Sequence, residues 1–473
     1  MHSHFSDKPH DQVIHIGTQL ELLIDEWLIA EKKNVSLQLQ VPRKEEVVWT
    51  SDYPWEGPLS GYFTIFQDGA LIRLYYRGGQ EDITCYAESQ DGIYFTKPSL
   101  GLYEFNGSTQ NNIVYRGPES TNFTPFLDQN PAAKPAEKYK AFGGEYFKGK
   151  GPGLIALCSP DGIHWQRMTD KPVKTLADGW FDSQNVGFWD TVANFYRSFT
   201  RTFTDPESGK VTYDINPAAI RAIQSSTSSD FIQWSKPQLN QYGRVPAEHL
   251  YNNVTLPVPG APHILVSFPM RLLQNRKKIM SHPELGVSDT LFMSSRDGLH
   301  WNRTFNQAWI RPGLDQRNWT ERSNMVAWGI IQTSSEEFSI YITEHYRWPT
   351  KSLRRYSLPC HRFASIQAKG EVGEWTTHPL TFSGDNLILN YSTSAAGYIQ
   401  VEVQDSGGNP IPGYELAASQ ELFGDELHGV LYWNNNLNLS SLKGQTVRFR
   451  FVMQDADIYV ISTASTQEGN GFS

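Results

Sequence analysis

The sequence predicts an all-β protein, with a five-bladed β-propeller followed by a C-terminal β-sandwich. The chain of 473 residues contains 14 Trp, 22 Tyr, 25 Phe, 37 Gly and 27 Pro, a composition that suits a loop-rich β protein. A turn motif recurs at nearly constant spacing, and strand-like segments recur in the same order between its copies. After residue 376 this repeat stops, and alternating strands of another kind follow.

The turn motif joins an Asp-Gly pair to a closing aromatic residue. Its copies cover residues 89–95, 159–165, 229–234 and 295–301, and a degenerate fifth copy covers 358–363. The steps between the closing aromatics are 70, 69, 67 and 62 residues. Such regular spacing is typical of stacked supersecondary units, and Asp-Gly suits the tight turn of a hairpin.

The segments between the turns predict four antiparallel strands per repeat. In the first repeat they include residues 62–66, 71–77 and 83–87. Five such units make a five-bladed propeller, which we expect to span residues 1–376 and to carry the catalytic site. Residues 377–473 are expected to form a separate, accessory β-sandwich, whose role is either stabilising, which we favour, or sugar-binding.

Charge and composition exclude several classes of partner. A formal net charge of −9 without a basic run argues against nucleic acid or an anionic membrane as partner. No stretch approaches the roughly 20 apolar residues of a membrane-spanning helix. The first residues lack the apolar core of a signal peptide, so we expect a periplasmic or secreted protein if such a peptide was trimmed, and a cytoplasmic one otherwise.

The cysteines and motifs indicate no cofactor. The three cysteines, Cys85, Cys158 and Cys360, are too widely spaced for a disulfide framework or a metal-binding pair. No cofactor motif is present, and a structural cation stays open. The oligomeric state is also open.

Propeller topology predicts where the chemistry lies. In each blade the innermost strand starts, and the second strand ends, on the same face, so polar residues at these points converge on one central pocket. The candidate catalytic acids there are Asp182, Glu56, Glu248 and Glu344. The candidate substrate-binding residues are Trp55, Arg77, Asn185, Arg201, Tyr251, Arg271, Trp319, Arg322 and His345.

These residue types suit the cleavage of a glycosidic bond. One carboxyl group protonates the leaving oxygen, and a second acts as nucleophile or activates water. Asp182 is the first choice, with its partner drawn from the other three acids. The arginines either keep carboxylates ionised or bind an acidic or sulfated substrate.

The repeats, the segment Asp182-Ser183-Gln184-Asn185 and the trailing sandwich together resemble bacterial glycoside hydrolases of the five-bladed propeller type, related to families 32 and 43. The resemblance implies a glycosidase of carbohydrate metabolism. Those families use an acid from the first blade as base or nucleophile, a second acid to orient it, and a glutamate as proton donor. The Asn-Asp-Pro-Asn and Arg-Asp-Pro motifs are absent here, so the resemblance is to a divergent branch and implies neither fructose as substrate nor a particular triad.

We therefore expect a glycoside hydrolase that is exo-acting on a plant or algal oligo- or polysaccharide, with a carbohydrate as its partner. Three alternatives stay open. A non-catalytic carbohydrate-binding propeller would bind sugars without turnover. A sialidase-like enzyme would use the repeated turns and the arginines, and a phosphorylase would depend on phosphate.

Overall fold

The computed structural model describes residues 13–80, 82–144, 153–214 and 216–465. The chain divides into two compact units. One contains residues 42–333 and 338–357, and the other contains residues 1–41, 334–337 and 358–473. Within the described ranges no helix is long and apolar enough to cross a membrane.

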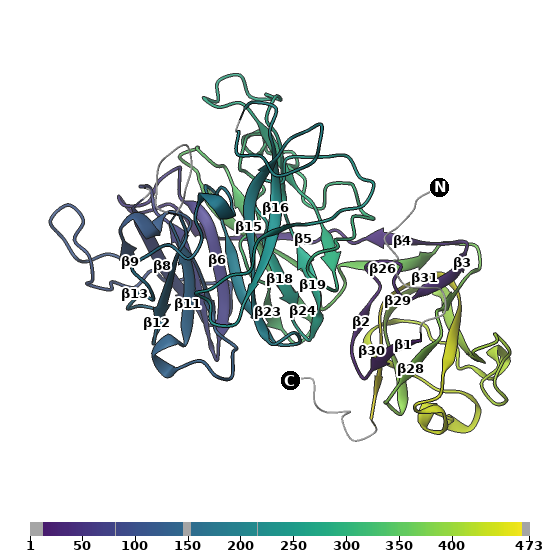
Figure 1. Ribbon diagram of the computed structural model, residues 1–473. Helices are drawn as coiled ribbons and strands as arrows, with labels where there is room; N and C mark the ends of the chain where they lie inside the picture. The colour runs from purple at the N-terminus through teal and green to yellow at the C-terminus, as the bar shows by residue number, and fades with distance from the viewer. Residues whose placement is uncertain (1–12, 81, 145–152, 215, 466–473) are drawn as a thin grey trace. The chain divides into compact units, whose positions relative to one another are not determined.

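The first unit is the predicted five-bladed propeller (Figure 1). Blade 1 contains β6 (Gly61–Asp68), β7 (Leu71–Arg77), β8 (Ile83–Ser89) and β9 (Ile113–Arg116). Blade 2 contains β10 (Thr124–Leu127), β11 (Tyr139–Gly143), β12 (Ile155–Ser159) and β13 (Gln166–Arg167). Blade 3 contains β14 (Val186–Asp190), β15 (Phe195–Thr204), β16 (Ile220–Ser228) and β17 (Gln238–Leu239).

Blades 4 and 5 depart from this simple order. Blade 4 contains β18 (Thr255–Val258), β19 (Ala261–Ser267) and β22 (Met293–Ser295), with a separate hairpin of β20 (Met270–Leu273) and β21 (Val287–Thr290). Blade 5 contains β23 (Ile331–Ser334), β24 (Glu337–Glu344) and β25 (Ser352–Pro359), and its outer strand is β5 (Arg43–Thr50) from the other end of the chain. Short 3-10 helices of this unit are η1 (Pro118–Ser120), η2 (Pro135–Glu137), η3 (Leu176–Asp178) and η4 (Gln316–Asn318).

Strand β5 closes the ring. Its Trp49 pairs in register with Leu353 of β25. The Trp49 side chain is buried and meets the rings of Phe63 and Tyr76 in blade 1 at 5.0 and 4.9 Å. An early segment of the chain thus completes the last blade while packing on the first, and this joins the two ends of the ring.

The repeated turn forms as the sequence predicts. In its first copy Asp91 Oδ1 accepts hydrogen bonds from the backbone N–H groups of Ile93 and Tyr94 at 2.8 and 2.9 Å. Gly92 lies in the left-handed region with φ 74°. In the third copy Phe231 takes this position with φ 66°, so a side chain replaces the usual glycine there.

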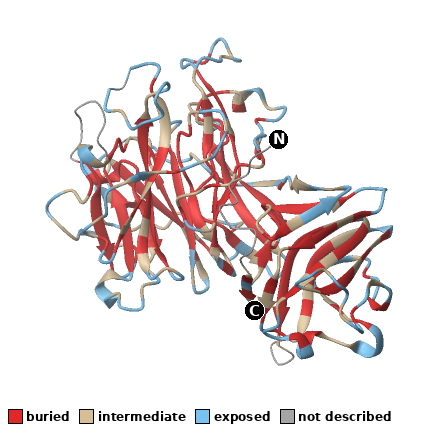
Figure 2. Ribbon diagram, turned by 45° about the vertical axis from the view of Figure 1, so that its right-hand side comes forward, coloured by how far each residue is buried: buried red, intermediate tan, exposed pale blue. Residues whose placement is uncertain are grey.

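The centre of the ring is filled by side chains. Gln184, which precedes β14, donates hydrogen bonds to Phe63 O and Thr64 Oγ1 of β6 at 3.1 and 3.0 Å. Blades 1 and 3 are not neighbours, so these bonds cross the propeller axis. Figure 2 shows the strands of the propeller largely buried.

The second unit is a ten-stranded β structure with its own hydrophobic core. Its strands are β1 (Ile14–Gly17), β2 (Glu21–Leu22), β3 (Ile29–Lys33), β4 (Val35–Leu39), β26 (Ala364–Ala368), β27 (Gly373–Thr377), β28 (Leu380–Phe382), β29 (Asn386–Asp405), β30 (Asp425–Leu431) and β31 (Val447–Ala464). Its 3-10 helices are η5 (Leu416–Ala418), η6 (Asn434–Asn436) and η7 (Leu439–Leu442).

Two long strands organise this sandwich. β29 pairs with β31 along both strands, and the register shifts between Thr393 and Tyr398. Opposite this shift Asp455 of β31 has φ 43°, so the regular pairing of the two strands is interrupted by a bulge there. One half of β31 pairs with β26 and the other half with β27.

The division of the chain differs from the predicted boundary at residue 376. Strands β26 and β27, which precede that boundary, pair with β31. Strands β1–β4 at the start of the chain also lie in this sheet, where β3 pairs with β27 and β4 with β26. The reason is backbone pairing, because strands from both ends of the chain satisfy the hydrogen-bonding groups of one sheet.

Candidate functional site at the propeller axis

Two tyrosines meet at the axis of the propeller. Tyr62 begins the inner strand of blade 1, and Tyr251 precedes the inner strand of blade 4. Their hydroxyl oxygens lie 3.1 Å apart, and both side chains are buried. Because blades 1 and 4 are not neighbours, this hydrogen bond spans the axis on the face where the inner strands start.

Four arginines surround this tyrosine pair. The guanidinium carbons of Arg201, Arg221 and Arg322 lie 5.1, 5.7 and 5.9 Å from the centre of the Tyr251 ring. Arg77 lies 4.7 Å from the centre of the Tyr62 ring. A cation over an aromatic face is attracted by the ring quadrupole, so the two rings hold positive charge around the axis.

Tyr346 of blade 5 completes the group. Its hydroxyl accepts a hydrogen bond from Arg77 Nη2 at 3.0 Å, and its ring centre lies 4.7 Å from Arg322. We call the whole set the axial cluster: Tyr62, Arg77, Arg201, Arg221, Tyr251, Arg322 and Tyr346. It draws residues from blades 1, 3, 4 and 5.

The arginines change the acidity of their neighbours. Burial raises the pKa of Tyr251, and Asp182 adds to this, but Arg322, Arg201 and the hydrogen bond with Tyr62 together outweigh both and lower the pKa of its phenol below the usual value. The pKa of Tyr62 moves the other way, because burial raises it and Tyr251 adds to the rise. Burial, Arg221 and Arg201 together lower the pKa of His249 to about 4. The site therefore favours an anion near Tyr251 and disfavours a further cation.

One predicted acid contacts the axial cluster directly. Asp182 Oδ1 lies 2.5 Å from Arg201 Nη2, and the Asp182 side chain is 18% exposed. The segment is held by Asn185, whose Nδ2 donates to Phe181 O and Ser183 O at 3.2 and 2.7 Å. Asn185 Oδ1 in turn accepts from the backbone N–H of Arg201 at 3.2 Å. Asn185 therefore positions both partners of the ion pair.

A second acid, Glu321, was not among the predicted site residues. Its Oε1 accepts from Arg347 Nε at 2.7 Å and from Arg322 Nη2 at 3.3 Å. Its side chain is 6% exposed. The only signal in the sequence is its place in the polar run 319–324, ahead of the inner part of blade 5.

The sequence also did not single out Tyr62, Arg221 and Tyr346. Arg221 is the second residue of β16, the third strand of its blade, opposite Phe203 of β15. β15 and β16 are longer than β14, so the third strand also reaches the face that carries the site. The starts of third strands are therefore a further place to look for site residues.

Glu56 lies in a separate, closed set of contacts in blade 1. Its carboxylate is fully buried, with an ion pair to Lys97 Nζ at 2.8 Å and a hydrogen bond from Tyr76 Oη at 2.6 Å. The backbone N–H groups of Asp52 and Tyr53 donate to it as well. The neighbouring Trp55 donates its Nε1–H to Asn112 Oδ1 at 2.6 Å. Its ring stacks on that of Tyr53, with the ring centres 4.8 Å apart.

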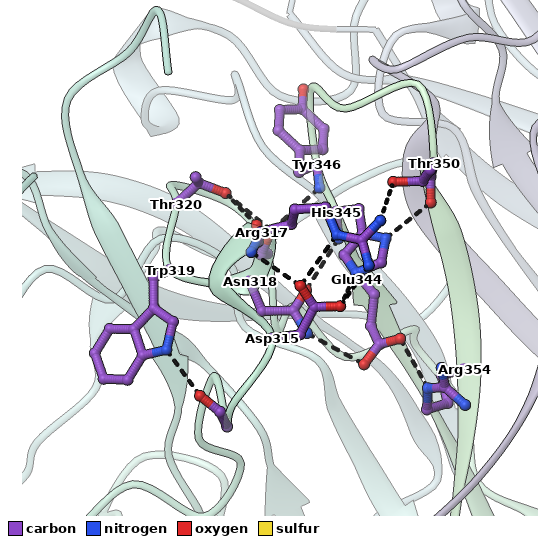
Figure 3. Close-up of polar contacts among 12 residues, drawn as sticks. Asp315, Arg317, Asn318, Trp319, Thr320, Glu344, His345, Tyr346, Thr350 and Arg354 are labelled. Atoms are coloured by element: carbon purple, nitrogen blue, oxygen red, sulfur yellow. Dashed lines mark hydrogen bonds and ion pairs between the residues drawn. The ribbon is translucent and has the colours of Figure 1, made fainter. Parts of the chain in front are cut away.

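Glu344 and His345 also lie among complete sets of partners (Figure 3). Glu344 is 1% exposed and pairs with Lys44 at 2.6 Å and Arg354 at 2.7 Å. Burial opposes its ionisation, but the hydrogen bonds from Lys44 and Arg354 lower its pKa. His345 Nε2 lies 2.9 Å from Asp315 Oδ2. Both residues stabilise the loops of blade 5.

Glu248, Arg271 and Trp319 belong to another part of the propeller. Arg271 bridges Glu248 at 2.9 Å and Asp289 at 2.7 Å, and Glu248 also pairs with Arg303. Arg271 and Trp319 line an open cavity of about 780 Å³ beside the β20–β21 hairpin. Other cations that line it are Arg276, Lys277, Lys278 and Arg311.

The described residues contain no group of three His, Cys, Asp or Glu side chains arranged to hold a metal ion. The arrangement at the axis thus offers an ion-paired carboxylate, phenols and guanidinium groups to a ligand. These groups suit a small polar molecule that carries hydroxyl groups and negative charge.

Comparison with known proteins gives likenesses of fold. No protein-family model matches the sequence, and no curated protein is significantly similar to it. Among solved structures, one titled simply a glycoside hydrolase has 13% identity and a TM-score of 0.46, with 67% of this chain and 92% of that chain covered. A thermostable family-43 glycoside hydrolase has 11% identity and a TM-score of 0.42, with 64% and 91% covered.

A fructofuranosidase from Schwanniomyces occidentalis has 10% identity and a TM-score of 0.39, with 89% of this chain and 96% of that chain covered. The resemblance to propeller glycoside hydrolases expected from the sequence thus reappears among the structural neighbours.

Proposed function

We propose that the propeller is a glycoside hydrolase whose site is the axial cluster, with Asp182 as a catalytic carboxylate. The observation that carries the proposal is the position of Asp182. Of the four predicted acids it is the one that contacts the axial cluster, and its side chain is 18% exposed. By contrast Glu56 and Glu344 are 0% and 1% exposed and fully partnered, so a substrate has no access to them.

Glycosidic cleavage requires a second ionisable group. Our first choice is Glu321, because it pairs with Arg322, whose guanidinium group lies near the Tyr251 ring as that of Arg201 does. Glu248 is the second choice, with a side chain 24% exposed beside Arg271. The contact with Arg201 suits Asp182 to the role of a nucleophile or a base.

We further propose exo-action on the end of a plant or algal saccharide. The hydrogen bonds from Gln184 to β6 cross the axis and fill the centre of the ring. With the centre filled, a substrate reaches the axial cluster from one face of the propeller, an approach that suits the end of a chain.

The test is release of reducing ends from arabinan, xylan, fructan and sulfated galactan oligosaccharides by the parent, Asp182→Asn and Glu207→Gln. Glu207 is an exposed acid of the same blade and serves as the matched control. We expect the parent and the control to release sugar alike, and Asp182→Asn to lose roughly 10²–10⁴-fold in rate.

Equal release by Asp182→Asn would remove Asp182 from the mechanism. Binding without any release would favour the carbohydrate-binding propeller instead. Release that requires inorganic phosphate would identify a phosphorylase.

A further inference from the structure

The axial cluster carries more positive charge than its own acids balance. It contains four arginines, and the acids in contact with it are Asp182 on Arg201 and Glu321 on Arg322. Glu321 is shared with a fifth arginine, Arg347. The chain as a whole has a formal net charge of −9, so this local excess is opposite in sign to the rest of the molecule.

Two of these arginines have no carboxylate partner in the described part of the chain. Arg77 donates to the neutral oxygens Leu59 O and Tyr346 Oη. Arg221 bonds neutral atoms too, since its Nη1 donates to Gln274 Oε1 at 3.0 Å and lies 3.4 Å from His249 Nδ1.

Arg221 has unused hydrogen-bonding capacity as well. Its Nε is buried and meets no acceptor among the described residues. A buried donor left unpaired costs free energy, and Arg221, a half-buried cation without a contacting carboxylate, has a further cost of charge. Burial and the neighbouring Arg201 accordingly lower the pKa of Arg221. An anion bound beside Arg221 would supply both the missing acceptor and the missing counter-charge.

We infer that the axial cluster binds an anionic substituent of the sugar, either a carboxylate or a sulfate ester, with Arg221 and Arg322 as specificity-determining residues. The inference rests on the proposed function in one respect, which is that the ligand is a sugar. Planar guanidinium groups bind carboxylate and sulfate oxygens in pairs of hydrogen bonds, whereas a neutral sugar leaves these charges without a partner. The substrate class is therefore an acidic or sulfated saccharide.

The experiment measures the binding of three monosaccharides, galactose, galacturonate and galactose 6-sulfate, by calorimetry. The proteins are the parent, Arg221→Gln and the control Arg276→Gln, whose side chain lines the separate cavity beside β20–β21. We expect the parent and the control to bind one anionic sugar at least about tenfold more tightly than galactose, and Arg221→Gln to lose this preference. Which of the two anionic sugars binds more tightly distinguishes a carboxylate site from a sulfate site.

Equal affinity of the parent for all three sugars would overturn the inference, as would a preference that Arg221→Gln retains. Thermal unfolding checks that Arg221→Gln folds. Should it fail to fold, Arg322→Lys replaces it, since this variant keeps the charge but loses paired hydrogen bonds and should weaken the preference. A preference for the anionic sugar that Arg322→Lys leaves unchanged would then count against the inference.

Turnover separates this inference from the proposed function. One result would support the anion site and contradict the hydrolase. In it, Asp182→Asn binds the anionic sugar, and the parent cleaves no oligosaccharide. A parent that cleaves neutral and acidic oligosaccharides equally well would support the hydrolase and contradict the anion site.

Discussion

At the scale of single residues, buried charges in the propeller are of two kinds. Glu56 has an ion pair and three further donors, and no water is needed to satisfy it. Arg221 has a buried donor without an acceptor among the described residues. A buried charge with all its partners is tolerated in a fold, because the partners offset the cost of desolvation, whereas an incompletely satisfied one leaves a group that a ligand can complete.

Lys174 is a buried charge whose effect on stability can be measured. Its Nζ donates to Ser226 Oγ and lies 4.5 Å from the centre of the Trp234 ring. Burial lowers the pKa of Lys174 to about 7. Between about pH 7 and pH 10 the unfolded chain therefore holds a proton that the folded chain lacks, so the free energy of unfolding should rise with pH by up to about 1.4 kcal/mol per unit. Below about pH 7 both states are protonated and the slope vanishes.

Urea unfolding at about pH 7, 8 and 9 checks this prediction. Lys174→Met should remove the contribution of this residue to the slope, because methionine does not titrate. Lys210→Met, at an exposed position, should keep it. The same pH profile in Lys174→Met as in the parent would show that Lys174 stays charged in the folded protein.

At the scale of elements, the repeated turn joins neighbouring blades. Tyr341 of blade 5 donates to Gly92 O in the turn of blade 1 at 2.8 Å, and Tyr75 of blade 1 donates to Gly162 O in the turn of blade 2 at 2.8 Å. Arg197 of blade 3 makes the corresponding bond to Asp297 O of blade 4 at 2.7 Å. The turns of blades 1, 2 and 4 therefore each accept a hydrogen bond from the preceding blade, which gives the motif a role in joining blades.

Substitution of Gly162 tests whether the turn joins neighbouring blades, and the same substitution at Gly107 is the control. Both glycines have positive φ, 77° and 83°, so alanine at either position should cost about 1 kcal/mol in backbone strain. A Cβ on Gly162 would also meet Tyr75 Oη at 2.8 Å and Arg73 Nη1 at 3.0 Å, whereas one on Gly107 would meet nothing within 4 Å. We expect Gly162→Ala to be about 1–2 kcal/mol less stable than Gly107→Ala in denaturant unfolding. Equal losses would show that the turn adapts freely to its neighbour.

The fold was more predictable than the site, and the elements show why. The blades could be predicted because the turn that joins neighbouring blades recurs in the sequence at nearly constant spacing. Arg77, Arg201, Tyr251 and Arg322 were found at the axis because blade topology fixes which strand ends meet. The partners of Glu56 and Glu344, which are Lys97 and Lys44, come from distant segments that no local pattern connects.

At the scale of the whole molecule, strands from the start of the chain pair with strands from its end in two places. β5 completes a blade that otherwise comes from residues beyond 330, and β1–β4 complete a sheet whose other strands lie beyond 360. Neither pairing could be predicted from the sequence repeat, because β1–β5 belong to no copy of it. This is why the predicted boundary at residue 376 separates strands that the structure pairs.

The pairing of β1–β4 with the C-terminal strands predicts how fragments of the chain behave. A fragment of residues 377–473 contains β28–β31 but lacks β26, β27 and β1–β4. It loses the pairing of β26 and β27 with β31, and the ring of Trp375 that stacks on Phe451 at 4.2 Å. We expect this fragment to be unfolded or aggregated, because both halves of β31 then expose unpaired backbone groups.

The measurement is the fluorescence and far-UV circular dichroism of two fragments, residues 377–473 and residues 358–473 mixed with a peptide of residues 13–41. Trp433 is buried in the intact protein, donates its Nε1–H to Val401 O at 2.9 Å, and is the one tryptophan of residues 377–473, so the emission of that fragment reports whether the core forms. The mixture with the longer fragment also contains Trp27 and Trp375, so Trp27→Phe and Trp375→Phe versions isolate the signal of Trp433 there. The shorter fragment should show the emission of a solvent-exposed tryptophan, and the peptide should restore a buried one to the longer fragment. A cooperatively folded 377–473 fragment would mean that β28–β31 form a core by themselves, and that the strands from the start of the chain only extend a sheet that is already stable.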